Sequence, residues 1–144
     1  MRSLLDVNVL IALLDAAHEH HRHARRWMEA NIEPGWASCP ITQNGCLRIM
    51  SQPAYPGVQP LAVLQERLRE ATETSWHRFW PDAISVLSPD LLDWGRVLGS
   101  RQLTDAYLLA LAIHHGGRFV TMDRSITPRT VVGARDEHLV RILP

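Results

Sequence analysis

Short apolar segments alternate with helical segments along this chain, and this alternation restricts the possible fold more than any other feature. The segments with the length and composition of short buried strands are 3–5, 36–39, 76–80, 118–122 and 139–143. The segments with apolar side chains at helical spacing are 7–14, 18–30, 43–50, 60–71 and 104–115. We therefore predict a three-layer α/β/α fold with a short, mainly parallel central sheet.

Length and composition limit the function classes. The 144 residues, 46% of them hydrophobic, suffice for one core, so a single domain over residues 1–144 is expected. No apolar run approaches the ~18–20 residues of a membrane span, and no membrane association is expected. Cys39 and Cys46, the only cysteines, are predicted to be reduced thiols in a cytoplasmic protein. The chain has no lysine, which excludes a P-loop lysine and Schiff-base chemistry.

Three aspartates stand where functional groups collect in a parallel α/β protein. Asp6 and Asp123 directly follow predicted strands, and Asp105 follows Thr104, the predicted N-cap of an apolar helix. Ligands bind at the carboxyl ends of parallel strands, so the three carboxylates are expected to converge there. Carboxylates packed together repel one another unless a cation joins them. An all-oxygen cluster of this kind favours Mg²⁺ or Mn²⁺.

Each of these acids, taken alone, also has a common structural explanation. An aspartate after a strand or at a helix start is most often a cap or a turn residue. The coincidence of three such positions favours a site over three independent caps. Asp6 is the most informative, because it lies within the otherwise apolar run Leu4–Leu10, interrupted only by Asn8.

The same positions carry a resemblance to a known family. The blocks concerned are Leu5-Asp6-Val7-Asn8-Val9-Leu10, Ile41-Thr42-Gln43-Asn44-Gly45 with Leu47-Arg48, His77-Arg78-Phe79-Trp80-Pro81, Thr104-Asp105-Ala106 and Phe119-Val120-Thr121-Met122-Asp123-Arg124. In order and spacing they resemble the PIN-domain family, and within it the VapC toxins of bacterial toxin–antitoxin pairs. The resemblance extends over nearly the whole chain.

The resemblance implies a fold, an activity and partners. It implies a PIN-like fold and a Mg²⁺- or Mn²⁺-dependent endoribonuclease, the toxin of a type II toxin–antitoxin system, that hydrolyses structured RNA with a metal-activated water. A small VapB-like antitoxin would inhibit it, and a homodimer is expected. Asp6, Asp105 and Asp123 would be the catalytic and metal-binding residues. Asn8 and Thr104 would hydrogen-bond and orient their carboxylates.

One position departs from the family pattern. Many members carry a glutamate where this chain has Gln43, which could serve as a neutral ligand or hold a water molecule. A catalytically weak or inactive RNA- or partner-binding module is therefore the alternative function. Arg48, one to two helical turns after Gln43, is the candidate RNA-binding residue.

Two further clusters have surface explanations. His18, His20, His21 and His23 could suggest a metal site, but a solvated helix start explains them better because no acid or cysteine completes the set. The strip formed by Arg22, Arg25 and Arg26 is suited to phosphate contacts, although a solvated helix face is the simpler explanation.

Overall fold

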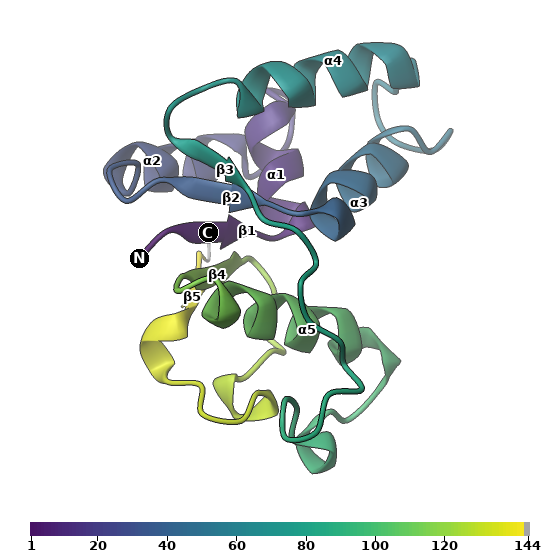
Figure 1. Ribbon diagram of the computed structural model, residues 1–144. Helices are drawn as coiled ribbons and strands as arrows, with labels where there is room; N and C mark the ends of the chain where they lie inside the picture. The colour runs from purple at the N-terminus through teal and green to yellow at the C-terminus, as the bar shows by residue number, and fades with distance from the viewer. Residues whose placement is uncertain (143–144) are drawn as a thin grey trace.

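The computed structural model describes residues 1–142 and has one sheet of five parallel strands (Figure 1). In chain order the strands are β1 (Ser3–Leu5), β2 (Trp36–Ser38), β3 (His77–Phe79), β4 (Arg118–Thr121) and β5 (Leu139–Arg141). The five predicted strands are confirmed, each one to two residues shorter than predicted or equal in length. Leu143, the end of the last predicted strand, lies outside the described residues.

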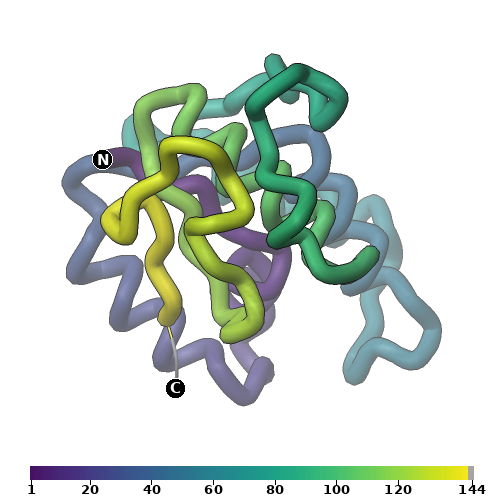
Figure 2. Tube along the Cα trace, turned by 90° about the horizontal axis from the view of Figure 1, so that it is seen from below, coloured from purple at the N-terminus to yellow at the C-terminus, as the bar shows by residue number. Residues whose placement is uncertain are grey.

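Helices cover both faces of this sheet, as the alternation predicted. On one face lie α1 (Val7–Leu14), α2 (His21–Ala30), α3 (Pro40–Met50) and α4 (Leu61–Thr72). On the other lies α5 (Ser100–His114), accompanied by the short 3-10 helices η1 (Trp94–Arg96), η2 (Pro128–Thr130) and η3 (Asp136–His138). Seen from below, the coil that follows β4 runs beside α5 (Figure 2). The result is the expected α/β/α arrangement.

The strands supply the core by alternating their side chains between the two faces. Leu4 and Phe119 pack against α5, whereas Leu5 and Val120 pack against α1. All four side chains are completely buried. Because both faces are covered, these strands are continuously apolar up to the point where each one ends.

The strand order β3-β2-β1-β4-β5 places β1 at the centre of the sheet. From β1 the chain proceeds outward through β2 and β3, then crosses back to β4 on the other side of β1 and ends at β5. The crevice between the carboxyl ends of β1 and β4 is thus a topological switch point, where parallel sheets bind their ligands. Leu5 and Val120 are in register at this edge, and the Asp6 amide donates to the Val120 carbonyl at 2.9 Å.

Two helices begin earlier than predicted. The helix predicted over 43–50 begins at Pro40, with Cys39 as N-cap, so Thr42 is not its N-cap; the Thr42 hydroxyl instead accepts a hydrogen bond from the Cys39 amide at 3.0 Å. Helix α5 begins at Ser100, so Thr104 is not an N-cap either. The first turn of α3 contains a proline and that of α5 is polar, so neither turn shows apolar periodicity. Proline is nevertheless well suited to the first position of a helix.

Helices α1 and α3 approach closely at a glycine. A Cβ atom at Gly45 would lie 2.7 Å from Cγ2 of Val7, the first residue of α1. Gly45 therefore lets α3 pack directly against the residue that follows Asp6. Among the described residues, no helix is both long and apolar enough to cross a bilayer.

Candidate active site

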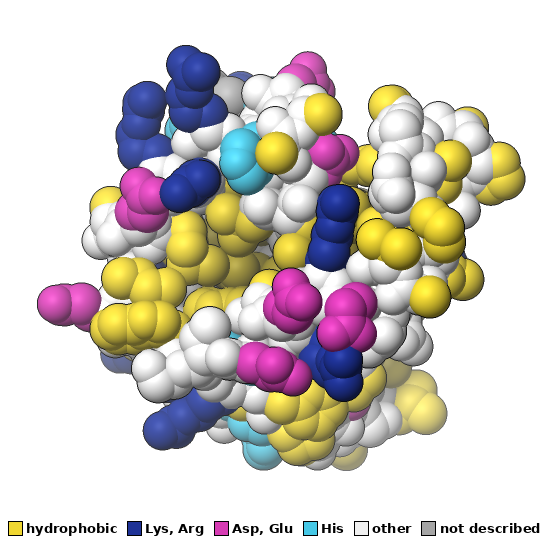
Figure 3. Space-filling model, turned by 90° about the horizontal axis from the view of Figure 1, so that it is seen from above, with side chains coloured by type: hydrophobic (Ala, Val, Ile, Leu, Met, Phe, Trp, Pro, Cys, Tyr) yellow, Lys and Arg dark blue, Asp and Glu magenta, His cyan; other side chains and the backbone are white. Residues whose placement is uncertain are grey.

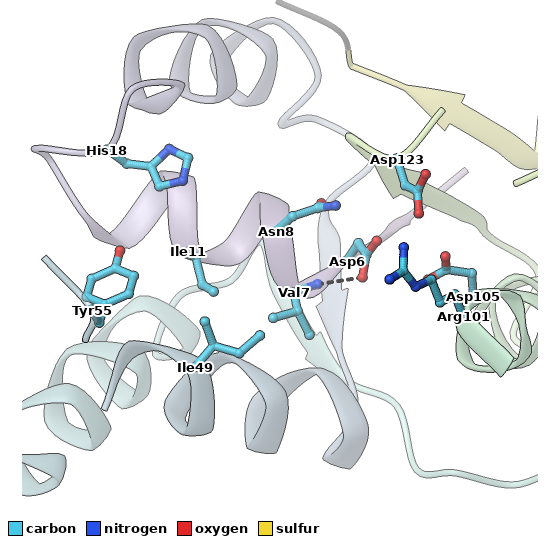
Figure 4. Close-up of a pocket in the computed structure, with 10 residues that line it drawn as sticks. All are labelled: Asp6, Val7, Asn8, Ile11, His18, Ile49, Tyr55, Arg101, Asp105 and Asp123. Atoms are coloured by element: carbon cyan, nitrogen blue, oxygen red, sulfur yellow. Dashed lines mark hydrogen bonds between the residues drawn. The ribbon is translucent and has the colours of Figure 1, made fainter. Parts of the chain in front are cut away.

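A cavity of about 470 Å³ opens at the switch point between β1 and β4. One end holds Asp6, Asp105 and Asp123, and the other holds His18 and Tyr55 (Figure 4). The residues between and around them are Val7, Asn8, Ile11, Ile49 and Arg101. The three aspartates predicted from the sequence thus line one cavity, although they are up to 117 residues apart in the chain.

Asp6 is held in position by the start of α1 and by β4. It is the N-cap of α1, and its Oδ1 accepts the Val7 amide at 2.7 Å. Its Oδ2 accepts the Thr121 hydroxyl at 2.6 Å. The residue is only 7% exposed, and burial raises the pKa of its carboxyl, with Asp123 adding to the rise and the two hydrogen bonds opposing it.

Asp123 is fixed by the turn after β4. Its Oδ1 accepts both the Ser125 amide and the Ser125 hydroxyl at 2.8 Å, and its own amide donates to the Thr121 hydroxyl oxygen at 3.0 Å. The hydrogen bond from the Ser125 amide is the main cause that lowers the pKa of Asp123 below its usual value. Asp123 is therefore the acid most readily ionised in this cluster.

Asp105 lies in the second turn of α5 rather than at its start. Burial, followed by the charges of Asp6 and Asp123, raises its pKa to about 7. The proximity of Asp105 and Asp123 also raises the pKa of Asp105 and lowers that of Asp123, as expected when two carboxyl groups can share one proton. Near neutral pH Asp105 therefore tends to hold a proton, and the cluster has one negative charge fewer, unless a cation compensates the charges of the carboxylates.

Asn8 and Thr121 join the two strand ends beneath the acids. The Asn8 side chain accepts the Met122 amide at 3.2 Å and donates to the Thr121 hydroxyl oxygen at 3.4 Å. Asn8 was predicted to orient a carboxylate directly, but it does so through Thr121. The Thr121 hydroxyl was missed as a site group, and the available signal was a polar residue at the end of an apolar strand, two positions before Asp123.

Three other predicted residues are not brought to the acids. Thr104 is exposed within α5 and does not line the cavity. Gln43 lines a separate hollow between α3 and α4 and donates to the Ser38 hydroxyl oxygen at 2.9 Å. Arg48 is exposed in the last turn of α3. Conversely, Arg101 lines the cavity one helical turn before Asp105, in a segment that was not predicted to be helical.

The donor set suits a hydrated divalent cation. Three carboxylates from three segments converge, and burial together with the charges of the other two acids raises the pKa of Asp105. Among residues 1–142, no group of three or more His, Cys, Asp or Glu side chains is arranged to hold a metal ion by itself. A small set of carboxylates is typical of sites for hydrated divalent cations, which keep several waters and take other ligands from substrate phosphates.

Comparisons with known proteins agree with this geometry. The sequence profile described as PIN domain matches residues 3–127. The chain is 51% identical over 142 residues to Ribonuclease VapC44 of Mycobacterium tuberculosis, covering 99% of this chain and 100% of the relative. It is 39% identical to Ribonuclease VapC39 of the same organism, covering 92% and 96%.

Two solved structures share the fold. One is M. tuberculosis VapC20, described as a sarcin-ricin loop cleaving toxin, with a TM-score of 0.58 and 16% identity over 92% of this chain and 98% of that one. The other is a toxin–antitoxin complex from Klebsiella pneumoniae, with a TM-score of 0.52 and 24% identity over 85% and 88%.

Proposed function

This chain belongs to the PIN domain family, and within it to the VapC ribonucleases, so we propose that it cleaves structured RNA with Asp6, Asp105 and Asp123 as the catalytic, metal-binding acids. The observation that carries the proposal is the convergence of these acids on one cavity. The raised pKa of Asp105 supports it, because such a cluster favours a divalent cation, Mg²⁺ or Mn²⁺.

Each residue at the acidic end has a distinct part in this proposal. When bound, the cation supplies positive charge to the scissile phosphate and activates the attacking water. Asp123 and Asp6 are the fixed anionic ligands, since hydrogen bonds hold both carboxylates in one orientation. Asp105 would complete the set as a carboxylate, because a bound cation would offset the charges of Asp6 and Asp123 that raise its pKa. Arg101 faces the same cavity and is suited to hold a phosphate oxygen, because a guanidinium matches phosphate geometry.

The proposal is tested by the change Asp105→Asn. The variant should lose RNA cleavage by at least about 100-fold while keeping its fold, because the amide replaces a ligand without changing its size. Cleavage of a structured RNA by the purified protein is measured with Mg²⁺ or Mn²⁺ and again after EDTA. Asp136→Asn, at an exposed acid of η3, is the matched control and should cleave like the wild type.

Two results would contradict the proposal. One is undiminished cleavage by folded Asp105→Asn protein. The other is wild-type cleavage that persists in EDTA, since this would show that no divalent cation is needed.

We also propose partners and a location. VapC toxins pair with antitoxins, and we infer that a small antitoxin inhibits this chain by covering the acids with a basic side chain. A homodimer is supported by the exposed apolar side chains of Leu87, Trp94 and Leu98. The free, buried thiols of Cys39 and Cys46 suit a cytoplasmic enzyme.

The alternative of a non-catalytic module rested on Gln43. Its amide is bonded to Ser38 outside the cavity that contains the acids, so the departure from the family pattern leaves those acids intact. This placement favours the enzyme.

A further inference from the structure

The cavity has a second end whose chemistry differs from that of the acids. Ile11 of α1 and Ile49 of α3 form apolar walls there, and the rings of His18 and Tyr55 close it (Figure 4). Ile11 lies five residues after Asp6 along α1, which corresponds to roughly 7 Å. Asp15, which the Tyr55 hydroxyl contacts, lies nine residues after Asp6, or roughly 13 Å along the same helix, so a base bound at this end is on the order of two nucleotides away from a phosphate bound at the acids.

Tyr55 is fixed in place at this end. It lies in the coil between α3 and α4, where its amide donates to the Gln52 carbonyl at 2.9 Å. Its hydroxyl donates to Oδ2 of Asp15 at 2.5 Å, and Oδ1 of Asp15 accepts the Ala17 amide at 3.0 Å. The ring is thus tied to a segment 40 residues earlier in the chain, so little conformational freedom is lost when a ligand packs on it.

His18 offers a directed hydrogen-bond donor. Its Nδ1 accepts the His20 amide at 3.0 Å, so the proton of the neutral ring is on Nε2. A flat ligand in this end would meet apolar walls, an aromatic ring and one N–H donor. Unpaired RNA bases are recognised by such a combination of stacking and hydrogen bonding at their edges.

From these contacts we propose that His18 and Tyr55 form a base-binding subsite, which holds an unpaired base about two nucleotides from the scissile phosphate and sets a nucleotide preference at that position near the cleavage site. The inference rests on the proposed function, since it requires RNA at the acids. An RNA base is favoured over a protein side chain because this end and the acidic end belong to one continuous cavity.

The test uses a pool of hairpin RNAs with randomised loops, cleaved in the presence of Mn²⁺, with the ends of the products sequenced. Wild-type protein should enrich particular bases at one position about two nucleotides from the cut. His18→Ala and Tyr55→Ala should lose this bias and raise KM about ten-fold, the effect expected for one stacked base, with kcat changed much less. Tyr55→Phe keeps the ring and should keep the bias. His114→Ala, at an exposed histidine in the last turn of α5, is the control.

Unchanged base preference and KM in both alanine variants would overturn the subsite, as would wild-type cleavage without any base preference. Thermal melting shows whether each variant is folded, and Tyr55→Leu replaces Tyr55→Ala if the latter is not. Binding of the same RNA to Asp105→Asn protein, with and without Tyr55→Ala, measures the subsite without cleavage. If the wild type never cleaves but the tyrosine change still weakens binding, the proposed function fails and the subsite stands.

Discussion

Asp105 is the residue whose ionisation depends most on its surroundings. Its pKa is about 7 in the folded protein, against a usual value of 3.8, because of burial and the neighbouring charges of Asp6 and Asp123. Folding therefore favours the protonated form. The stability that this contributes is complete below about pH 4 and is lost as the pH rises through 7.

We predict that the metal-free protein becomes less stable between pH 5 and pH 8, by on the order of 1–2 kcal/mol. This change is smaller than the one that the whole rise of the Asp105 pKa would give at ~1.4 kcal/mol per pKa unit. The reason is that Asp105 is partly exposed, and solvent screens its charge. Urea unfolding across this range measures the slope. Asp105→Asn should flatten the slope and be more stable at pH 8, and all other side chains are common to both proteins. Mn²⁺ should raise the stability of the wild type at pH 8. Equal pH slopes in the two proteins would show that Asp105 is not under this repulsion.

For single residues, the acids of the site are easier to predict from the sequence than the residues that donate hydrogen bonds to them. A charge inside an apolar run, such as Asp6, is conspicuous because burial without a purpose is costly. Thr121 and Ser125 are ordinary residues in the sequence. Their roles depend on contacts with Asp6 and Asp123 that only the folded turn provides.

The α1–α3 contact is the element-scale feature on which the position of Asp6 depends. We predict that Gly45→Ala destabilises the protein by about 1–3 kcal/mol, because its Cβ would overlap the stiff side chain of Val7. The cost of this overlap should exceed the ~1 kcal/mol by which a helix favours alanine over glycine, so the net effect is a loss of stability. Chemical denaturation measures it. The double variant Gly45→Ala with Val7→Ala should lose less than the sum of the two single changes. Strict additivity would mean that the two residues do not press on each other.

The elements themselves were predictable where apolar periodicity is strong. Helix α1 has the predicted bounds, and β1 ends at Leu5 as expected. The start of α5 was missed because Ser100, Arg101 and Gln102 carry no apolar periodicity. That helix begins after Gly99, where the Gln102 side chain accepts the Leu98 amide at 2.7 Å. For this reason Arg101 was not predicted to line the site, because only a residue within the helix lies one turn before Asp105.

For the whole molecule, charge is balanced in total but not in distribution. The 15 arginines equal the 15 acids in number. On the face seen from above, several basic side chains gather at the upper left and several acidic ones near the centre, each group with a side chain of the other charge beside it, and apolar side chains lie between the two groups (Figure 3). Three of the arginines, Arg22, Arg25 and Arg26, line one hollow on α2.

We predict that RNA binding depends only weakly on salt, because few cations can contact the backbone of the substrate. The logarithm of 1/KM against the logarithm of the salt concentration should have a slope of about −2 to −3, at ~0.7 per phosphate contacted in a single strand. Arg22→Gln with Arg26→Gln should reduce the magnitude of this slope by about 1. Arg129→Gln, in η2, is the control for loss of one positive charge at another position. A slope unchanged by the α2 substitutions would place the RNA elsewhere.

The central position of β1 also has a consequence for the order in which this enzyme is made. β1 leaves the ribosome first, but its neighbour β4 and the residues Thr121 and Asp123 are among the last quarter of the chain to be synthesised. At about 5–20 residues per second, roughly 6 to 23 seconds separate Asp6 from Asp123. An unfinished copy therefore lacks a complete set of acids. A cell that translates this toxin is exposed to its activity only after synthesis has passed Asp123.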